Sequence, residues 1–404
     1  MYRLARAATC IVSLMGSGSR PRVEQGFMND LHTTDPVHMS DFQAQWRGTR
    51  DATLAAVERV GASGRFVLGA EVAAFEEELS AFWGMPLAVG CASGLDAIEI
   101  ALRCAGLQPG QRVLTTPLSA FASTLAVRRA GGIPVFVDVD DTGLLDLALA
   151  ERALEEHRDV RFLLLVHLYG QAADADRLAR LRERFELLVI EDCAQSIGAS
   201  SRGTPTGATS HASATSFYPT KNLGCLGDGG AVLTASAECA ELARSLRDYG
   251  QTDKYVHRHF GLNSRLDEIQ AAILRDAFLP GLSDRIARRR SIAARYDAEL
   301  RNPHLQLPKR PEGSDGAWHL YPVLVSGSRS SFQRHLERAR IFSDVHYPTL
   351  IPYQAALDVD RSMLLTPLSK AQGFASREVS LPIHPFLDDR SIERVVEACN
   401  SWRP

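Results

Sequence analysis

Between residues 87 and 192, short apolar runs alternate with segments of helical periodicity, and this alternation constrains the fold more than any other feature of the chain. The apolar runs span residues 87–90, 112–115, 134–138, 162–168 and 187–192. They are apolar at consecutive positions, as expected for parallel strands that helices cover on both faces. The segment after the first run has helical spacing, because Leu95, Ile98 and Leu102 fall on one face. The pattern predicts an α/β fold with a mostly parallel sheet.

The chain is long enough for two domains. Its 404 residues can bury a large core and a second, smaller one. A helical region at 266–300 is broken at Pro280-Gly281, and we place the boundary there. We therefore expect a large domain at 41–281 and a smaller C-terminal α+β domain at 282–404.

The first 40 residues are expected to be a leader, either disordered or upstream of the true start. Arg3 and Arg6 precede a short apolar stretch at 7–15, which faintly resembles a secretory signal. The stretch is short, and Met28 and Met39 are both plausible alternative starts. We favour the leader interpretation over a signal peptide.

Composition indicates a cytoplasmic protein. The net charge of -3 gives no sign of a nucleic-acid or membrane-surface partner. The seven cysteines form no CxxC pair, which is typical of reduced thiols. No run approaches the length of a membrane-spanning helix. No metal site is expected, since His257 and His259 have no third ligand at a suitable spacing.

A lysine and a carboxylate are predicted to meet at one site. Lys221 lies between the segment that begins at Ser216 and a glycine-rich run at 224–230. Asp192 ends an apolar run, and ligands in such folds bind at the carboxyl ends of strands. An enzyme that uses pyridoxal phosphate (PLP) needs a lysine for the Schiff base and an acid that keeps the pyridine nitrogen protonated. Alone, the lysine would be a surface charge and the aspartate a helix cap; together they favour catalysis.

Other residues could hold the same cofactor. Ser93 and Gly94 precede a helix, where free amides can cap the helix or bind a phosphate, and both roles can hold. Ser216 could donate a further hydrogen bond to that phosphate, and Gln195 could bind the ring hydroxyl. Phe121 would be a core residue if it stood alone, but next to a flat cofactor it becomes a stacking candidate.

Over residues 41–400 the chain resembles the DegT/DnrJ/EryC1/StrS family of sugar aminotransferases. These are PLP enzymes of the aspartate-aminotransferase fold (fold type I), with a large domain of mostly parallel sheet and a smaller C-terminal domain. The resemblance rests on motifs that occur in order along the chain: 92–97 (Ala-Ser-Gly-Leu-Asp-Ala), 134–138 (Pro-Val-Phe-Val-Asp), 166–171 (Val-His-Leu-Tyr-Gly-Gln), 191–195 (Glu-Asp-Cys-Ala-Gln), 216–222, 227–230 (Gly-Asp-Gly-Gly) and 263–270 (Asn-Ser-Arg-Leu-Asp-Glu-Ile-Gln).

The resemblance implies a role for each candidate. It implies that Lys221 is the Schiff-base lysine and proton shuttle, and that Asp192 contacts the pyridine nitrogen. It also implies that Ser93, Gly94 and Ser216 contact the phosphate. Gln195 is implied to contact the ring hydroxyl, and Phe121 to stack on the ring face. Asn263 matches a phosphate contact that reaches over from a second subunit, which implies a homodimer with shared active sites.

The resemblance also implies an activity. The family's usual donor is L-glutamate, and the acceptor is a keto group of a nucleotide-linked sugar. We expect the C3 position of a deoxy sugar, because the C4 branch more often carries Asn-Tyr-Arg where this chain has Asn-Ser-Arg at 263–265. Lys254, His346 and Tyr347 are candidate substrate contacts. Amination at C4 remains an alternative.

Departures from the family pattern leave a second class of function open. They fall at Ala120, Thr215, Pro352 and His384, where substrate is expected. A PLP-binding regulatory protein without turnover is therefore a rival hypothesis. A nicotinamide-dependent enzyme is a weaker one, because the chain has no phosphate-binding fingerprint.

Overall fold

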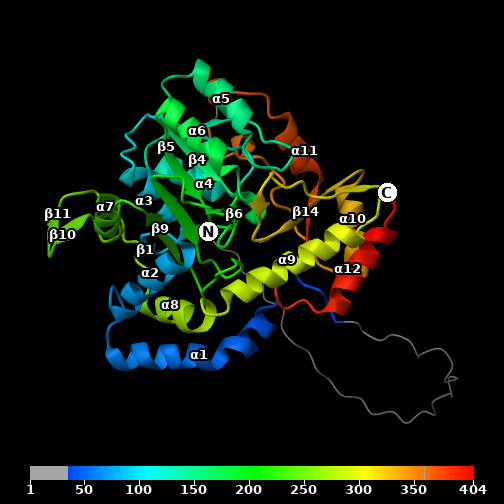
Figure 1. Cartoon of the computed structure of the whole chain (residues 1–404), viewed down its shortest axis with the longest axis horizontal. Coiled ribbons are helices and arrows are strands. Elements are labelled where there is room, and N and C mark those ends of the chain that lie inside the picture. Colours follow the sequence, from blue (N-terminus) through cyan, green and yellow to red (C-terminus); the bar gives the residue numbers. More distant parts are fainter. Residues whose placement is uncertain (1–34, 359) are drawn as a thin grey trace, which may run out of the picture. The chain divides into compact units, whose positions relative to one another are not determined.

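The computed structural model describes residues 35–358 and 360–404, and Pro36–Pro404 form one compact unit (Figure 1). Most of the expected leader, including the signal-like stretch and Met28, lies outside the described residues. Val37 is buried, and its N–H donates to the carbonyl of Arg340 over 2.8 Å. Residue 37 therefore packs with the C-terminal part of the chain.

A seven-stranded sheet forms the centre of the molecule, in the order β1-β9-β8-β5-β4-β2-β3. All neighbouring pairs from β3 to β8 are parallel, whereas β9 is antiparallel to both of its neighbours. This confirms the predicted mostly parallel sheet and adds one antiparallel strand. The strands are β1 (Leu87–Cys91), β2 (Arg112–Thr115), β3 (Ile133–Phe136), β4 (Phe162–Val166), β5 (Leu188–Asp192), β8 (Ala212–Ser216) and β9 (Gly230–Thr234).

Helices cover both faces of this sheet, as the apolar runs require. On β4, Leu164 packs with α3, α4 and α7, whereas its neighbours Leu163 and Leu165 pack with α5 and α6 on the opposite face. The third group of helices, α1, α2 and α8, packs on the part of the sheet near β1 and β9. The bounds are α1 (Phe42–Ser63), α2 (Ala70–Trp83), α3 (Gly94–Cys104), α4 (Phe121–Arg129), α5 (Leu147–Glu156), α6 (Ala175–Phe185), α7 (Ala237–Arg247) and α8 (Glu268–Ile273).

The C-terminal part builds its own antiparallel sheet, in the order β12-β14-β15. Its core is rich in large rings, among them Tyr296, Tyr321, Phe332 and Trp402. Helix α9 begins at Leu282, where the small domain was expected to start, and the division into two domains remains a prediction. The elements are α9 (Leu282–Glu299), β12 (Leu305–Gln306), β14 (Tyr321–Val325), α10 (Arg329–Arg338), α11 (Ser369–Arg377), β15 (Glu378–Leu381) and α12 (Asp389–Ser401).

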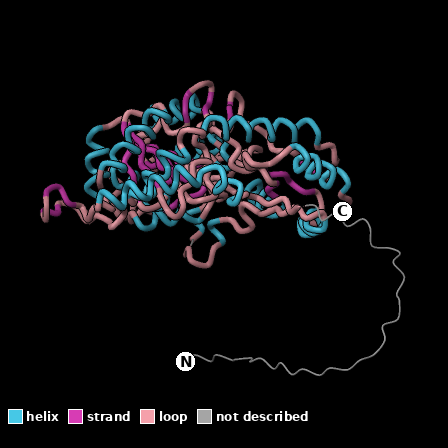
Figure 2. The backbone as a smooth tube through the Cα atoms, turned by 90° about the horizontal axis from the view of Figure 1, so that it is seen from below, coloured by secondary structure: helices cyan, strands magenta, loops and turns pink. Residues whose placement is uncertain are grey.

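Two smaller strand groups complete the fold. In the first, β13 (Ser314–Asp315) pairs with β6 (Ser200–Ser201), which pairs with β7 (Thr204–Pro205). This group links the C-terminal part of the chain to the segment between β5 and β8. The second is a hairpin of β10 (Gln251–Asp253) and β11 (Val256–His257), which projects from the body (Figures 1 and 2). In the part of the chain that the structure describes, no helix combines the length and the apolar character needed to cross a bilayer.

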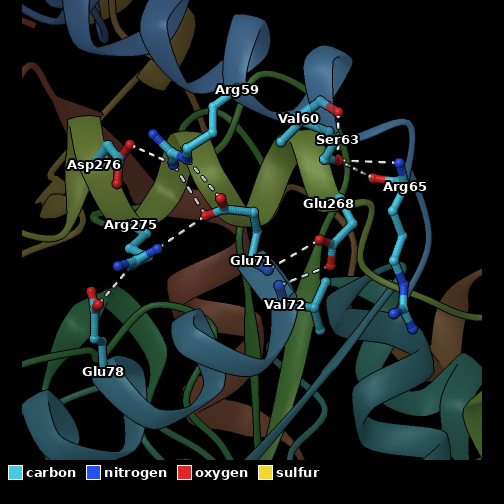
Figure 3. Close-up of polar contacts among 10 residues, drawn as sticks. All are labelled: Arg59, Val60, Ser63, Arg65, Glu71, Val72, Glu78, Glu268, Arg275 and Asp276. Carbon is cyan, nitrogen blue, oxygen red and sulfur yellow. Dashed lines mark hydrogen bonds and ion pairs between the residues drawn. The ribbon is translucent and has the colours of Figure 1, made fainter. Parts of the chain in front are cut away.

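Charged residues hold α1, α2 and α8 together (Figure 3). Glu268 accepts hydrogen bonds from the N–H groups of Gly69, Glu71 and Val72, at 2.7, 3.0 and 2.9 Å. These are among the amides that the first turn of a helix leaves unpaired, so Glu268 caps α2. Glu268 belongs to the 263–270 motif that carries the family resemblance, and its contacts are structural.

Candidate active site

Lys221 lies in a turn that follows β8, and its N–H donates to the carbonyl of Tyr218 over 2.8 Å. Its side chain is partly buried. Burial lowers the pKa of the amine to about 8, and the negative charge of Asp192 acts against this shift. The chain has four lysines, and the other three, at 254, 309 and 370, are exposed. Lys221 is therefore the lysine whose surroundings favour a neutral, nucleophilic amine.

Asp192 ends β5, as the sequence predicted, and is buried. Its two carboxylate oxygens have separate donors. The hydroxyl of Ser123 donates to Oδ2 over 2.8 Å, and the N–H of Ala194 donates to Oδ1 over 3.1 Å. These bonds fix the orientation of the carboxylate. Its electrostatic interaction with Lys221 shows that the fold brings the predicted pair to one site.

Gln195 follows β5 and is buried. Its Oε1 accepts from the N–H of Tyr169 over 2.6 Å, which leaves the amide NH₂ group as a donor. Burial raises the pKa of Tyr347 to about 12. The charge of Asp192 adds to this rise, and a hydrogen bond with the Gln195 side chain opposes it. Tyr347, which was predicted as a substrate contact, therefore faces two of the predicted cofactor residues.

Ser93, Gly94 and Ser216 form a narrow cradle at the start of α3. The hydroxyl of Ser93 caps the helix and accepts from the N–H of Asp96 over 3.1 Å. A Cβ added at Gly94 would lie 2.6 Å from the Cβ of Ser216, and one added at Gly230 would lie 2.5 Å from the backbone of Ser93. The helix N-terminus, two hydroxyls and close backbone approach fit a phosphate group.

We expect Gly94→Ala to weaken PLP binding by at least about tenfold, since the new methyl group would displace Ser216 from the cradle. PLP titration of the cofactor-free protein, followed by absorbance, measures this change. Gly48→Ala in α1 is the matched control, because no atom lies within 4 Å of its added Cβ. Equal PLP affinity in both variants would contradict the assignment of the cradle.

Phe121 is the first residue of α4 and is partly buried. It packs beside the cluster that contains Phe136 and Ile351. Ser123, which orients Asp192, lies in the same turn of the helix. The stacking role of Phe121 remains a prediction.

Two predicted residues, Asn263 and Lys254, lie at the surface of the chain. Asn263 is exposed, and its Oδ1 accepts from the Arg265 guanidinium over 2.6 Å. Lys254 is exposed in the β10–β11 hairpin, with its Nζ 5.3 Å from the centre of the Tyr255 ring. For Asn263 this placement is compatible with a role in a second subunit.

Sequence reasoning missed His319, a buried histidine next to the site. Its Nδ1 has no hydrogen-bond partner among the described residues. Burial lowers its pKa well below the usual value, and the positive charge of Lys221 adds to this effect. Ser123 was missed as well. Nothing in the sequence spacing links Ser123 to Asp192 or His319 to Lys221, because each pair is brought together only by long-range packing.

The fold and the lysine–carboxylate pair define a PLP-dependent enzyme of fold type I. The model of the DegT/DnrJ/EryC1/StrS aminotransferase family matches residues 48–400, and the chain belongs to this family. The predicted family and the predicted kind of enzyme, an aminotransferase, are thereby confirmed.

Characterised relatives match nearly the whole chain. The dTDP-3-amino-3,4,6-trideoxy-alpha-D-glucose transaminase of Streptomyces venezuelae is 41% identical over 377 residues, which cover 93% of this chain and 98% of the relative. The erythromycin biosynthesis sensory transduction protein EryC1 of Saccharopolyspora erythraea is 40% identical, covering 89% and 98%. The UDP-2-acetamido-2-deoxy-3-oxo-D-glucuronate aminotransferase of Pseudomonas aeruginosa is 36% identical, covering 90% and 99%.

Solved structures agree with the fold and the cofactor. The crystal structure of DesV from S. venezuelae has a TM-score of 0.87 and 41% identity, and the match covers 91% of this chain and 99% of DesV. NtdA from Bacillus subtilis, solved with bound cofactor PMP, has a TM-score of 0.79 and 29% identity, covering 87% and 81%. The predicted cofactor, PLP with its amino form PMP, is that of the family.

Proposed function

We propose that this protein transfers the amino group of L-glutamate to the C3 keto group of a nucleotide-linked deoxy sugar. The single observation that carries the chemistry is a partly buried lysine of lowered pKa beside the buried, hydrogen-bonded Asp192. The C3 position is supported by relatives whose names contain a 3-amino or a 3-oxo sugar. The Asn-Ser-Arg form at 263–265 supports the same position.

Different residues of the chain are assigned different roles in this reaction. Ser93, Gly94 and Ser216 would hold the phosphate, and Asp192 would keep the pyridine nitrogen protonated. Bound PLP supplies an electron-accepting ring that stabilises the negative charge left when a carbon loses its proton. Lys221 would hold the cofactor at rest, and its amine, once free, would serve as the group that moves the proton. The donor and the sugar use one site in turn, which gives ping-pong kinetics.

A two-stage experiment tests this function. The PLP-loaded protein is mixed first with L-glutamate and then with a panel of 3-keto and 4-keto nucleotide sugars. We expect the cofactor's absorbance to change to that of PMP with glutamate, and the mass of an amino sugar to appear with a 3-keto substrate. If product formed only from the 4-keto sugars, the position of amination would be C4. No conversion by glutamate would favour the rival, a PLP-binding regulatory protein.

We also propose that the working unit is a homodimer. The β10–β11 hairpin and the chain after it carry exposed apolar rings, with Tyr255 81% and Phe260 96% exposed. Such exposure is typical of a surface that a partner covers. Asn263 lies close behind this hairpin and would then reach the partner's phosphate. Mixing Lys221→Ala chains with Asn263→Ala chains would restore one intact site per mixed dimer, so recovery of activity on mixing checks the arrangement.

A further inference from the structure

A buried acid, Glu378, connects to the active site through one serine. Glu378 and Ser380 are adjacent same-face residues of β15, and both are 0% exposed. The Oε1 of Glu378 lies 2.5 Å from the Oγ of Ser380, and that Oγ lies 2.9 Å from the Nδ1 of His346. The Oε2 of Glu378 accepts from the N–H of His346 over 2.6 Å. The three side chains form a continuous hydrogen-bonded chain.

The outer end of this chain lies at the site already described. The carbonyl of His346 accepts from the hydroxyl of Tyr169 over 2.8 Å, and the N–H of Tyr169 binds Gln195. Tyr347, the next residue, forms a hydrogen bond with the Gln195 side chain, and the charge of Asp192 raises its pKa. The imidazole of His346 interacts electrostatically with Lys221. Its Nε2 has no hydrogen-bond partner among the described residues, so it is the free end of the chain.

A serine hydroxyl has one proton to donate, which permits two arrangements of the chain. When Glu378 is protonated, its O–H donates to Ser380, Ser380 donates to Nδ1 of His346, and Nε2 carries the imidazole proton. When Glu378 is ionised, Ser380 donates to the carboxylate and can only accept from His346. The proton of His346 is then on Nδ1, and Nε2 presents a lone pair.

We propose that Glu378, Ser380 and His346 form a proton-linked switch, in which the protonation of Glu378 sets the tautomer that His346 presents at the active site; this role rests on the proposed function. When the acid ionises, the carboxyl proton of Glu378 moves to Ser380, the hydroxyl proton of Ser380 moves to Nδ1, and the Nε2 proton leaves to solvent. One proton is released in total. Uptake of one proton at Nε2 and the reverse sequence restore the first arrangement.

The acidity of Glu378 places this switch near pH 8, because burial raises the pKa of the carboxyl to about 8. The charged groups that face Glu378 are Asp344, which adds to the rise, and Arg329, which opposes it. Tyr169 and Tyr347 also face it, and its charge raises the pKa of both. Burial lowers the pKa of His346, the charge of Asp344 opposes this shift, and the charge of Lys221 adds to it, which favours the neutral imidazole that both arrangements need.

The titration of Glu378 can be observed without cofactor or turnover, by difference infrared spectroscopy of the cofactor-free protein between pH 6 and pH 10. We expect a protonated-carboxyl band that disappears with a midpoint near pH 8 and is missing in Glu378→Gln. Glu268→Gln is the matched control, a buried glutamate outside the chain, and should keep the band. Absence of a band that depends on Glu378 would overturn the proposal, whatever the activity of the enzyme.

The second readout is the pH dependence of the glutamate half-reaction. Glutamine at 378 reproduces the hydrogen bonds of the protonated acid, so we expect near-normal rates at pH 7 and loss of the inflection near pH 8. Ser380→Ala should slow the reaction about tenfold, and Ser380→Thr, which keeps a hydroxyl, should restore most of the rate. An unchanged inflection in Glu378→Gln, or equal rates for the alanine and threonine variants, would overturn the switch.

Discussion

Replacing Lys221 with alanine is expected to abolish transamination, with a loss of at least about 10⁴-fold in the glutamate half-reaction. The variant lacks both the amine that holds the cofactor and the base that moves the proton. Bound PLP should also lose the visible band that depends on its bond to lysine. Stopped-flow absorbance and product mass measure both effects.

Lys309→Ala is the control for this variant. Lys309 is exposed, and its Nζ lies 2.8 Å from a carboxylate oxygen of Asp141. A surface ion pair of this kind contributes less than about 1 kcal/mol, so activity should stay unchanged. A Lys221→Ala protein that still converts glutamate at a rate near wild type would remove Lys221 from the mechanism.

The second large effect is expected from Asp192→Asn, with a loss of about 10²- to 10³-fold in the half-reaction. Asparagine keeps the shape and can still accept from Ala194, but it carries no charge to hold a pyridine nitrogen protonated. Because the carboxylate raises the pKa of Lys221, the pKa of that amine should fall further below about 8 in the variant. The pH dependence of Lys221 acetylation in the cofactor-free protein measures this shift.

Ser123→Ala separates charge from orientation. It removes the 2.8 Å hydrogen bond to Asp192 and leaves the carboxylate charged. We expect a smaller loss than in Asp192→Asn, with the pKa of Lys221 still near 8. Activity within a few-fold of wild type in Asp192→Asn would argue against a role for the carboxylate in catalysis.

Local pattern was sufficient to predict five of the seven strands of the large sheet. The five apolar runs from residue 87 to residue 192 become β1 to β5, because consecutive buried positions leave few alternatives to a covered parallel strand. Strand ends also located Asp192. The strands β8 and β9 were not predicted, and the antiparallel direction of β9 depends on pairing with β1 and β8 rather than on its own residues.

Partners across long sequence separations could not be predicted. Ser123 and Asp192 are 69 residues apart, and the two ends of the bond from Glu378 to the His346 N–H are 32 residues apart. Glu378 opens a strand, where a glutamate usually faces solvent, and only the packing of the C-terminal sheet shows that it is buried. The burial of His319 likewise follows from tertiary packing and could not be predicted from its neighbours in the sequence. Motifs identified the lysine and the carboxylate, whereas the groups that tune them come from tertiary contacts.

The central claim is that the Lys221 side chain holds PLP. The most direct measurement is borohydride reduction of the PLP-loaded protein, followed by digestion and peptide mass spectrometry. Only four lysines can carry the label, and three of them are exposed. We predict a stoichiometric pyridoxyl group on the peptide that contains Lys221 and none on the peptides that contain Lys254, Lys309 or Lys370. A label on any of those three, or no label at all, would contradict the account.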